Sequence, residues 1–106
     1  MDALRLSLEA LALPENSEII VPANTFVGTA IAVQAAGAVV VPAEIIDKTG
    51  QIDHHKLDHY LTNKTKVIIP VHLYGFMGDM HYINNWAEKN NIIVLEDAAQ
   101  AHGSMY

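Results

Sequence analysis

The feature that most constrains the fold is a repeated alternation of short, β-branched apolar runs with helical segments. Two of these runs, Val67-Ile68-Ile69 and Ile92-Ile93-Val94-Leu95, do not alternate in polarity. Strands of this kind are buried on both faces, at the centre of a sheet that helices cover. Strands that alternate with helices indicate an α/β domain with a mainly parallel sheet. We therefore expect a mainly parallel sheet flanked by helices, with these two runs in central positions.

The remaining elements follow from periodicity and from turn residues. Strands are predicted at 18–22, 38–42, 66–71 and 92–96, and helices from residue 2 to before Pro14, at about 26–36, from Asp53 to about 61 and from Asp79 to about 89. Asp53 and Asp79 are the expected N-caps of the last two helices, and Gly37 is expected to end the second. No linker or internal repeat interrupts this order, so we expect one domain.

Composition excludes several classes of protein. The chain has 106 residues, of which 51% are hydrophobic and 17% charged, a net charge of −6 and no cysteine. A chain in which half the residues are apolar is not expected to be disordered. Its basic residues are scattered along the sequence, which argues against nucleic-acid binding. Without cysteine there is no disulfide framework and no zinc thiolate site. No apolar run approaches the roughly 20 residues of a membrane span, and the N-terminus does not resemble a signal peptide. We expect a soluble cytoplasmic protein.

The candidate functional residues lie just after the predicted strands, because ligands of open α/β sheets bind outside the carboxyl ends of the strands. These segments are 24–26, 72–75 and 97–103. Asp97 follows a wholly apolar strand, so its carboxylate needs a cation, a metal, N–H donors or a protonated ring nitrogen. It could equally cap the next turn through backbone amides. The residues alone leave both interpretations open.

The stretch Glu96-Asp97-Ala98-Ala99-Gln100-Ala101-His102-Gly103 closely resembles the aspartate motif of the DegT/DnrJ-type sugar aminotransferases, which are pyridoxal-phosphate (PLP) enzymes of fold type I. The segments 18–26, 36–42 and 63–75 are similar to further blocks of that family, in the family's order. The resemblance implies an aspartate aminotransferase-like large domain. It also implies a parent enzyme of nucleotide-sugar and polysaccharide biosynthesis, a homodimer that transfers an amino group, from glutamate by analogy, to a nucleotide-linked keto-sugar.

The same resemblance assigns three cofactor-binding residues. Asp97 would pair with the pyridine nitrogen of PLP and keep it protonated, which makes the ring a better electron sink. Phe26 falls where the family places an aromatic residue against the cofactor ring, although from its residue type alone it reads as a core aromatic. Gln100 matches the position that hydrogen-bonds the 3-hydroxyl oxygen of the cofactor.

Several histidines and one tyrosine are weaker candidates. His72 and Tyr74, at the end of the third predicted strand, are candidates for the wall of the site. His102 is expected to be a structural hydrogen-bonding residue. His55 and His59 have the i, i+4 spacing that can bind a metal on an α-helix. Their segment, which also carries His54, is polar throughout and reads as a solvated surface helix, so we assign no metal.

Relative to the family, three parts are missing: the glycine-containing turn that binds the PLP phosphate, the Schiff-base lysine beyond the aspartate motif, and the C-terminal small domain. None of the lysines present matches the family's position; these are Lys48, Lys56, Lys64, Lys66 and Lys89. Residues 1–106 are therefore expected to be a partial PLP-binding large domain with no catalytic residue assigned. We expect it to be inactive alone, to bind PLP weakly and without a covalent bond, and to expose apolar surface.

Two alternatives come from the same resemblance. A PLP-dependent sugar dehydratase would carry histidine in place of the lysine, and a non-catalytic α/β module would keep the core and use it for interaction. Asp97 and Gln100 argue against the second, because an interaction module has no need for a carboxylate at that edge. A metal protein built on the histidine cluster is a third alternative.

Overall fold

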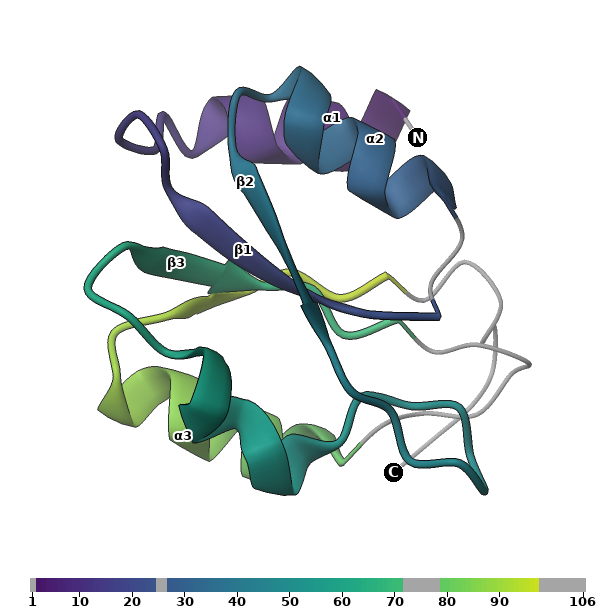
Figure 1. Ribbon diagram of the computed structural model, residues 1–106. Coiled ribbons are helices and arrows are strands. Elements are labelled where there is room, and N and C mark those ends of the chain that lie inside the picture. Colours follow the sequence, from purple (N-terminus) through teal and green to yellow (C-terminus); the bar gives the residue numbers. More distant parts are fainter. Residues whose placement is uncertain (1, 25–26, 72–78, 98–106) are drawn as a thin grey trace.

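The computed structural model describes residues 2–24, 27–71 and 79–97 and has the expected α/β architecture (Figure 1). Its helices are α1 (Asp2–Ala10), α2 (Val27–Ala35), the 3-10 helix η1 (His54–Tyr60) and α3 (Met80–Lys89). Its strands are β1 (Glu18–Pro22), β2 (Val39–Ala43), β3 (Thr65–Ile68) and β4 (Ile93–Val94). The strands form one parallel sheet in the order β2-β1-β3-β4. The prediction of a parallel sheet flanked by helices is confirmed.

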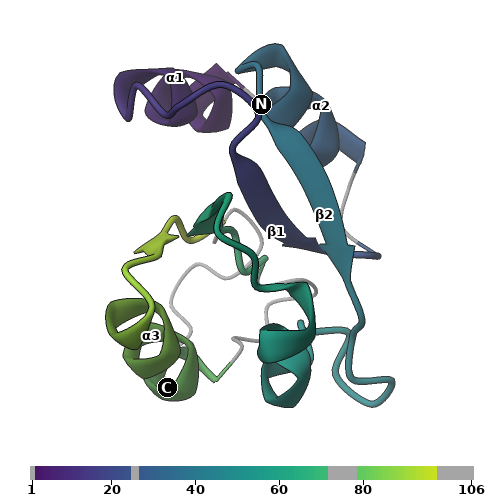
Figure 2. The ribbon, with the colours of Figure 1, turned by 60° about the vertical axis from the view of Figure 1, so that its left-hand side comes forward.

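The helices cover both faces of the sheet. Figures 1 and 2 show α1 and α2 together on one face, and η1 and α3 together on the other. Because side chains alternate along a strand, β1 contributes to two cores. Ile19 and Val21 belong to the cluster that includes Leu8 of α1 and Val33 of α2. Ile20, between them, belongs to the cluster that includes the buried residues of η1 and α3.

The expected two-sided burial holds for β3 and not for β4. Val67, Ile68 and Ile69 are fully buried, and β3 pairs with a strand on each side. The prediction that the run 92–95 is central is wrong in the part of the sheet that the structure describes, where β4 is an edge strand. Ile92 and Val94 pack on the α3 side, so Ile93 faces the opposite side, where it is 42% exposed. The run is apolar, and its second face is only partly covered, because Leu95 packs against the cluster that includes Leu8 and Val33 while Ile93 remains exposed.

The helix ends follow the predicted signals with one exception. Asp53 accepts a hydrogen bond from the backbone N–H of His55, and Asp79 accepts one from that of Tyr82, so both predicted N-caps are confirmed. Gly37, at a φ of +81°, follows α2 as expected. The first helix is shorter than predicted and ends at Ala10, because Ala12 takes a positive φ of 49° that no α-helix accommodates.

Within the described ranges, no helix has both the length and the apolar character needed to cross a membrane.

Candidate functional site

Asp97 lies at the carboxyl edge of the sheet, as the sequence predicts. Its backbone N–H donates to the carbonyl of Pro70 over 3.0 Å, and Val71 and Asp97 form an isolated parallel bridge. The pairing between the third and fourth strands therefore resumes beyond β4 and reaches Asp97. Since all four strands are parallel, their carboxyl ends share this edge.

The Asp97 side chain contacts a second element, the first turn of α2. The hydroxyl Oγ1 of Thr29 donates to Asp97 Oδ2 over 3.4 Å. Thr29 is only 3% exposed, and Asp97 is half-buried. α2 approaches the sheet through a buried face of mostly small residues, Gly28, Thr29, Ala32 and Val33. The contact thus joins a buried hydroxyl of the second helix to a carboxylate at the end of the sheet.

Thr29 was not among the residues predicted from the sequence. A polar residue on the otherwise apolar buried face of α2 was the available signal. The sequence shows the small residues of this helix, but it does not show which of its faces turns toward Asp97.

The loop after β1 is fixed at the same edge. The N–H of Ala23 donates to the carbonyl of Ala43 over 2.8 Å, which extends the pairing of β1 with β2. Asn24 Nδ2 donates to the carbonyl of Gly50 over 3.1 Å, which joins this loop to the turn between β2 and η1. These bonds hold Ala23 and Asn24, the last residues described before the predicted stacking residue, Phe26.

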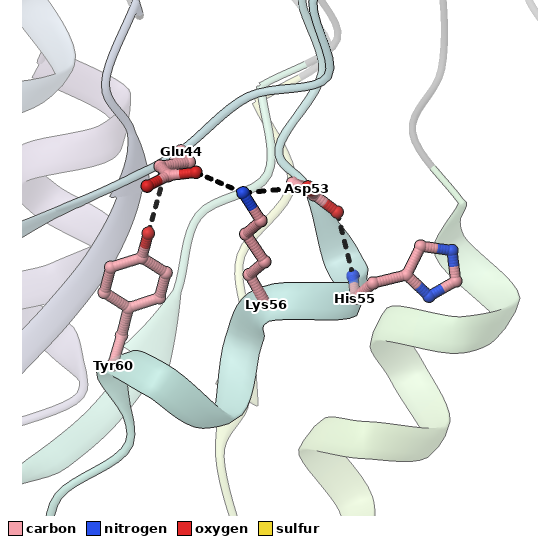
Figure 3. Close-up of polar contacts among 5 residues, drawn as sticks. All are labelled: Glu44, Asp53, His55, Lys56 and Tyr60. Carbon is pink, nitrogen blue, oxygen red and sulfur yellow. Dashed lines mark hydrogen bonds and ion pairs between the residues drawn. The ribbon is translucent and has the colours of Figure 1, made fainter.

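An exposed polar network joins the end of β2 to η1 (Figure 3). Lys56 pairs with Glu44, and its Nζ lies 3.9 Å from Asp53 Oδ2. The N–H of Glu44 donates to the hydroxyl oxygen of Tyr60 over 2.9 Å. The hydrogen bond and charge of Glu44 raise the pKa of Lys56. A lysine that acts as a nucleophile needs a lowered pKa, so the pairing with Glu44 does not favour that role for Lys56.

The histidines of η1 do not have metal-binding geometry. A 3-10 helix has three residues per turn, so residues four apart point roughly 120° apart instead of sharing a face. His55 and His59 therefore lack the shared helix face on which the metal alternative rested. His54 instead lies 3.6 Å from Asp79 Oδ2, and its ring packs against that of Tyr82 at 4.8 Å between centroids. In the residues that the structure describes, no group of three or more His, Asp or Glu side chains could hold a metal ion.

A groove of about 910 Å³ runs along α3, on the side of the sheet opposite α1 and α2. Its lining includes Asp58, Tyr82 and Trp86, and the indole Nε1 of Trp86 donates to Asp58 Oδ1 over 2.8 Å. Asp97, the predicted cofactor residue that the structure describes, is not among the residues that line this groove. It is a surface feature between η1 and α3, separate from the edge that carries Asp97.

Of the three predicted cofactor residues, the structure places Asp97. Phe26 and Gln100 lie outside the described residues, as do His72, Tyr74 and His102. Their proposed contacts therefore remain predictions.

Comparison with known proteins gives a match over the whole chain. Residues 1–106 match the DegT/DnrJ/EryC1/StrS aminotransferase family. The chain is 39% identical over 106 residues to dTDP-3-amino-3,4,6-trideoxy-alpha-D-glucose transaminase of Streptomyces venezuelae, covering 100% of this chain and 28% of that protein. It is 42% identical over 102 residues to 3-oxo-glucose-6-phosphate:glutamate aminotransferase of Bacillus subtilis, covering 96% of this chain and 23% of that protein. The chain thus spans about a quarter of the length of these curated relatives.

The fold is shared with solved structures. Escherichia coli GDP-4-keto-6-deoxy-D-mannose-3-dehydratase with bound hydrated PLP superimposes with a TM-score of 0.90 at 32% identity, covering 99% of this chain and 27% of that chain. The chain is therefore similar both to sugar aminotransferases and to a sugar dehydratase.

Proposed function

The chain belongs to the DegT/DnrJ/EryC1/StrS aminotransferase family, and on that premise we propose that it forms the central, cofactor-binding part of a PLP-dependent aminotransferase. The proposed acceptor is a nucleotide-linked keto-sugar, and the proposed amino donor is glutamate. A dTDP-sugar transaminase and a glutamate aminotransferase among the relatives support these two assignments. The observation that carries the proposal is the Asp97 carboxylate at the carboxyl edge of a parallel sheet.

The donor chemistry at this edge fits PLP. Asp97 is half-buried and already accepts a hydrogen bond at Oδ2, so its carboxylate is oriented as an acceptor. Such a group would hold the proton on the pyridine nitrogen. When bound, PLP supplies an electron sink for breaking the Cα–H bond of the amino donor. Phe26 is proposed to cover one face of the ring, and Gln100 to contact its 3-hydroxyl oxygen.

The proposal gives no catalytic role to the lysines within residues 1–106. Lys56, with its raised pKa, is held by Glu44. We propose that the 106-residue polypeptide alone binds PLP weakly, without a covalent bond, and does not turn over. PLP that stays on the purified polypeptide through dialysis, with a shifted absorbance band, would contradict this.

The main test replaces Asp97 in the full-length protein. Asp97→Asn keeps the size of the side chain and removes its charge, so transamination from glutamate to a nucleotide-linked keto-sugar should fall on the order of 10²-fold or more. Asp47→Asn, in the exposed turn after β2, is the matched control and should leave the rate unchanged. Equal, measurable rates for Asp97→Asn and the unmodified protein would reject the role of Asp97. No transamination by either protein would favour a non-catalytic module.

A sugar dehydratase is the second candidate, because a dehydratase is among the solved structures that share this fold. The two reactions give different products from one keto-sugar. Mass spectrometry should find an amino sugar with glutamate present if the chain serves an aminotransferase. A deoxygenated sugar without incorporated nitrogen would identify the dehydratase.

The proposed enzyme acts in the cytoplasm as a homodimer. Two apolar side chains of α2 are exposed, Val27 at 62% and Ile31 at 44%. Their exposure supports the proposal that another protein surface covers α2 in the assembled enzyme. Light scattering on the full-length protein should give twice the chain mass. A monomer at micromolar concentration would reject the dimer without affecting the assignment of Asp97.

A further inference from the structure

We infer that Thr29 is a positioning residue that sets the orientation of the Asp97 carboxylate toward the cofactor ring. The inference rests on the proposed function, because it assigns the partner of the proposed pyridine-nitrogen contact. Its basis is the hydrogen bond from Thr29 Oγ1 to Asp97 Oδ2, which joins residues 68 positions apart in the chain.

The sequence separation of the bonded residues distinguishes Thr29 from the other buried hydroxyl residues of the described chain. Ser17 and Thr65 hydrogen-bond backbone carbonyls three and five residues away, which stabilises their own turns. Thr29 directs its hydroxyl to a carboxylate on another element. A helical threonine can also satisfy its hydroxyl locally, through a carbonyl of the preceding turn. The bond to Asp97 therefore serves the carboxylate rather than the helix alone.

Packing alone does not call for a hydroxyl at this position. Thr29 lies on the buried face of α2 with Gly28, Ala32 and Val33, and it is 3% exposed. Valine has the same shape, and burying a polar group costs free energy unless the group is hydrogen-bonded. The hydroxyl of Thr29 on this apolar face is therefore explained by its hydrogen bonding, which includes the bond to Asp97.

The contacts of Asp97 with Pro70 and with Thr29 act on different parts of the residue. The backbone N–H bond to Pro70 fixes its main chain against the extension of β3. The Thr29 bond restricts rotation of the side chain. An ionised carboxylate has about four acceptor positions, so a bond from Thr29 is compatible with a second donor such as a protonated ring nitrogen.

The test uses the full-length protein loaded with PLP labelled with ¹⁵N at the pyridine nitrogen. Thr29→Val should move the ¹⁵N resonance toward the unprotonated position and weaken PLP binding about fivefold to tenfold, as expected for one lost hydrogen bond. Thr29→Ser keeps the hydroxyl and should restore both values. Thr65→Val makes the same change at a residue of similar burial, at the amino end of β3. It should leave the resonance unchanged even if it lowers the melting temperature.

The outcomes separate this inference from the function it rests on. An unchanged resonance and unchanged PLP affinity in Thr29→Val would overturn the positioning role. An unchanged resonance in Asp97→Asn would instead overturn the proposed function. If Thr29→Val does not fold, Thr29→Ala removes the same hydroxyl with a better helix former, and the same two readouts decide.

Discussion

The helices on opposite faces of the sheet differ in what they turn outward. α3 buries Met80, Ile83, Trp86 and Ala87 and turns polar side chains outward, as a solvent-facing helix does. α2 carries no charged residue, and its Val27 and Ile31 remain exposed. A helix that is apolar all round is normally buried. The few charged residues of the chain are therefore unevenly distributed. The α3 face has a polar surface, whereas the exposed side of α2 has no charge and a single polar side chain, Gln34.

The strongest test of this comparison truncates one isoleucine on each helix. Ile83 of α3 is fully buried, so Ile83→Ala should lower the free energy of unfolding by about 2–5 kcal/mol. Ile31 of α2 is 44% exposed, so Ile31→Ala should cost less than about 1 kcal/mol. Urea unfolding of the 106-residue polypeptide, followed by circular dichroism, measures both losses. Equal losses would mean that the outer side of α2 is covered.

A smaller effect is expected at the start of α3. Asp79 caps this helix through the N–H of Tyr82 and lies 3.6 Å from His54 Nε2, so Asp79→Ala should cost about 1 kcal/mol. Asp47→Ala removes the same charge from an exposed turn and should be nearly neutral. If both variants unfold at the same urea concentration, the cap contributes nothing and the α3 side depends on its buried residues alone.

The smallest effect concerns η1, which shares the face of α3. Glu44 raises the pKa of Lys56 in the folded state, so the ion pair stabilises the fold below the ordinary lysine pKa. This contribution is lost as the pH rises through the raised value. The stability difference between the unmodified chain and Lys56→Met should therefore be constant near neutral pH and shrink at strongly alkaline pH. Thermal melts across that range measure it, and Lys48→Met, in an exposed turn, is the control. A difference that grows with pH would contradict the pairing.

Local signals predicted much of the fold. β1 has the predicted bounds, and Asp53 and Asp79 cap the helices they were expected to cap. Such features depend on residues within one turn of each other. The run of β4 was predicted to be central, but β4 lies at the edge of the described sheet. An apolar run shows that a strand can be buried, but it does not show which neighbouring elements cover it.

In the candidate site, too, the feature with a local sequence signal was predicted and the features that depend on three-dimensional packing were not. Asp97 was predicted because it directly follows an apolar strand within a recognisable motif. Its contact with Thr29 was not, because that contact depends on how α2 is rotated against the sheet. The 3-10 geometry of η1 was also missed. It separates His55 from His59, whose spacing suits a metal only on an α-helix.

The strand order has a consequence for how the chain acquires its structure. β2 and β3 follow one another along the chain yet lie on opposite sides of β1. During synthesis β1 and β2 can pair as soon as α2 and β2 have emerged, while the other edge of β1 waits for η1 and β3. In that interval an apolar segment centred on Ile19-Ile20-Val21 presents open backbone groups, the arrangement that favours pairing between chains. Glu18 and Pro22 flank it, and a charge and a proline at the ends of such a segment discourage that pairing until β3 arrives.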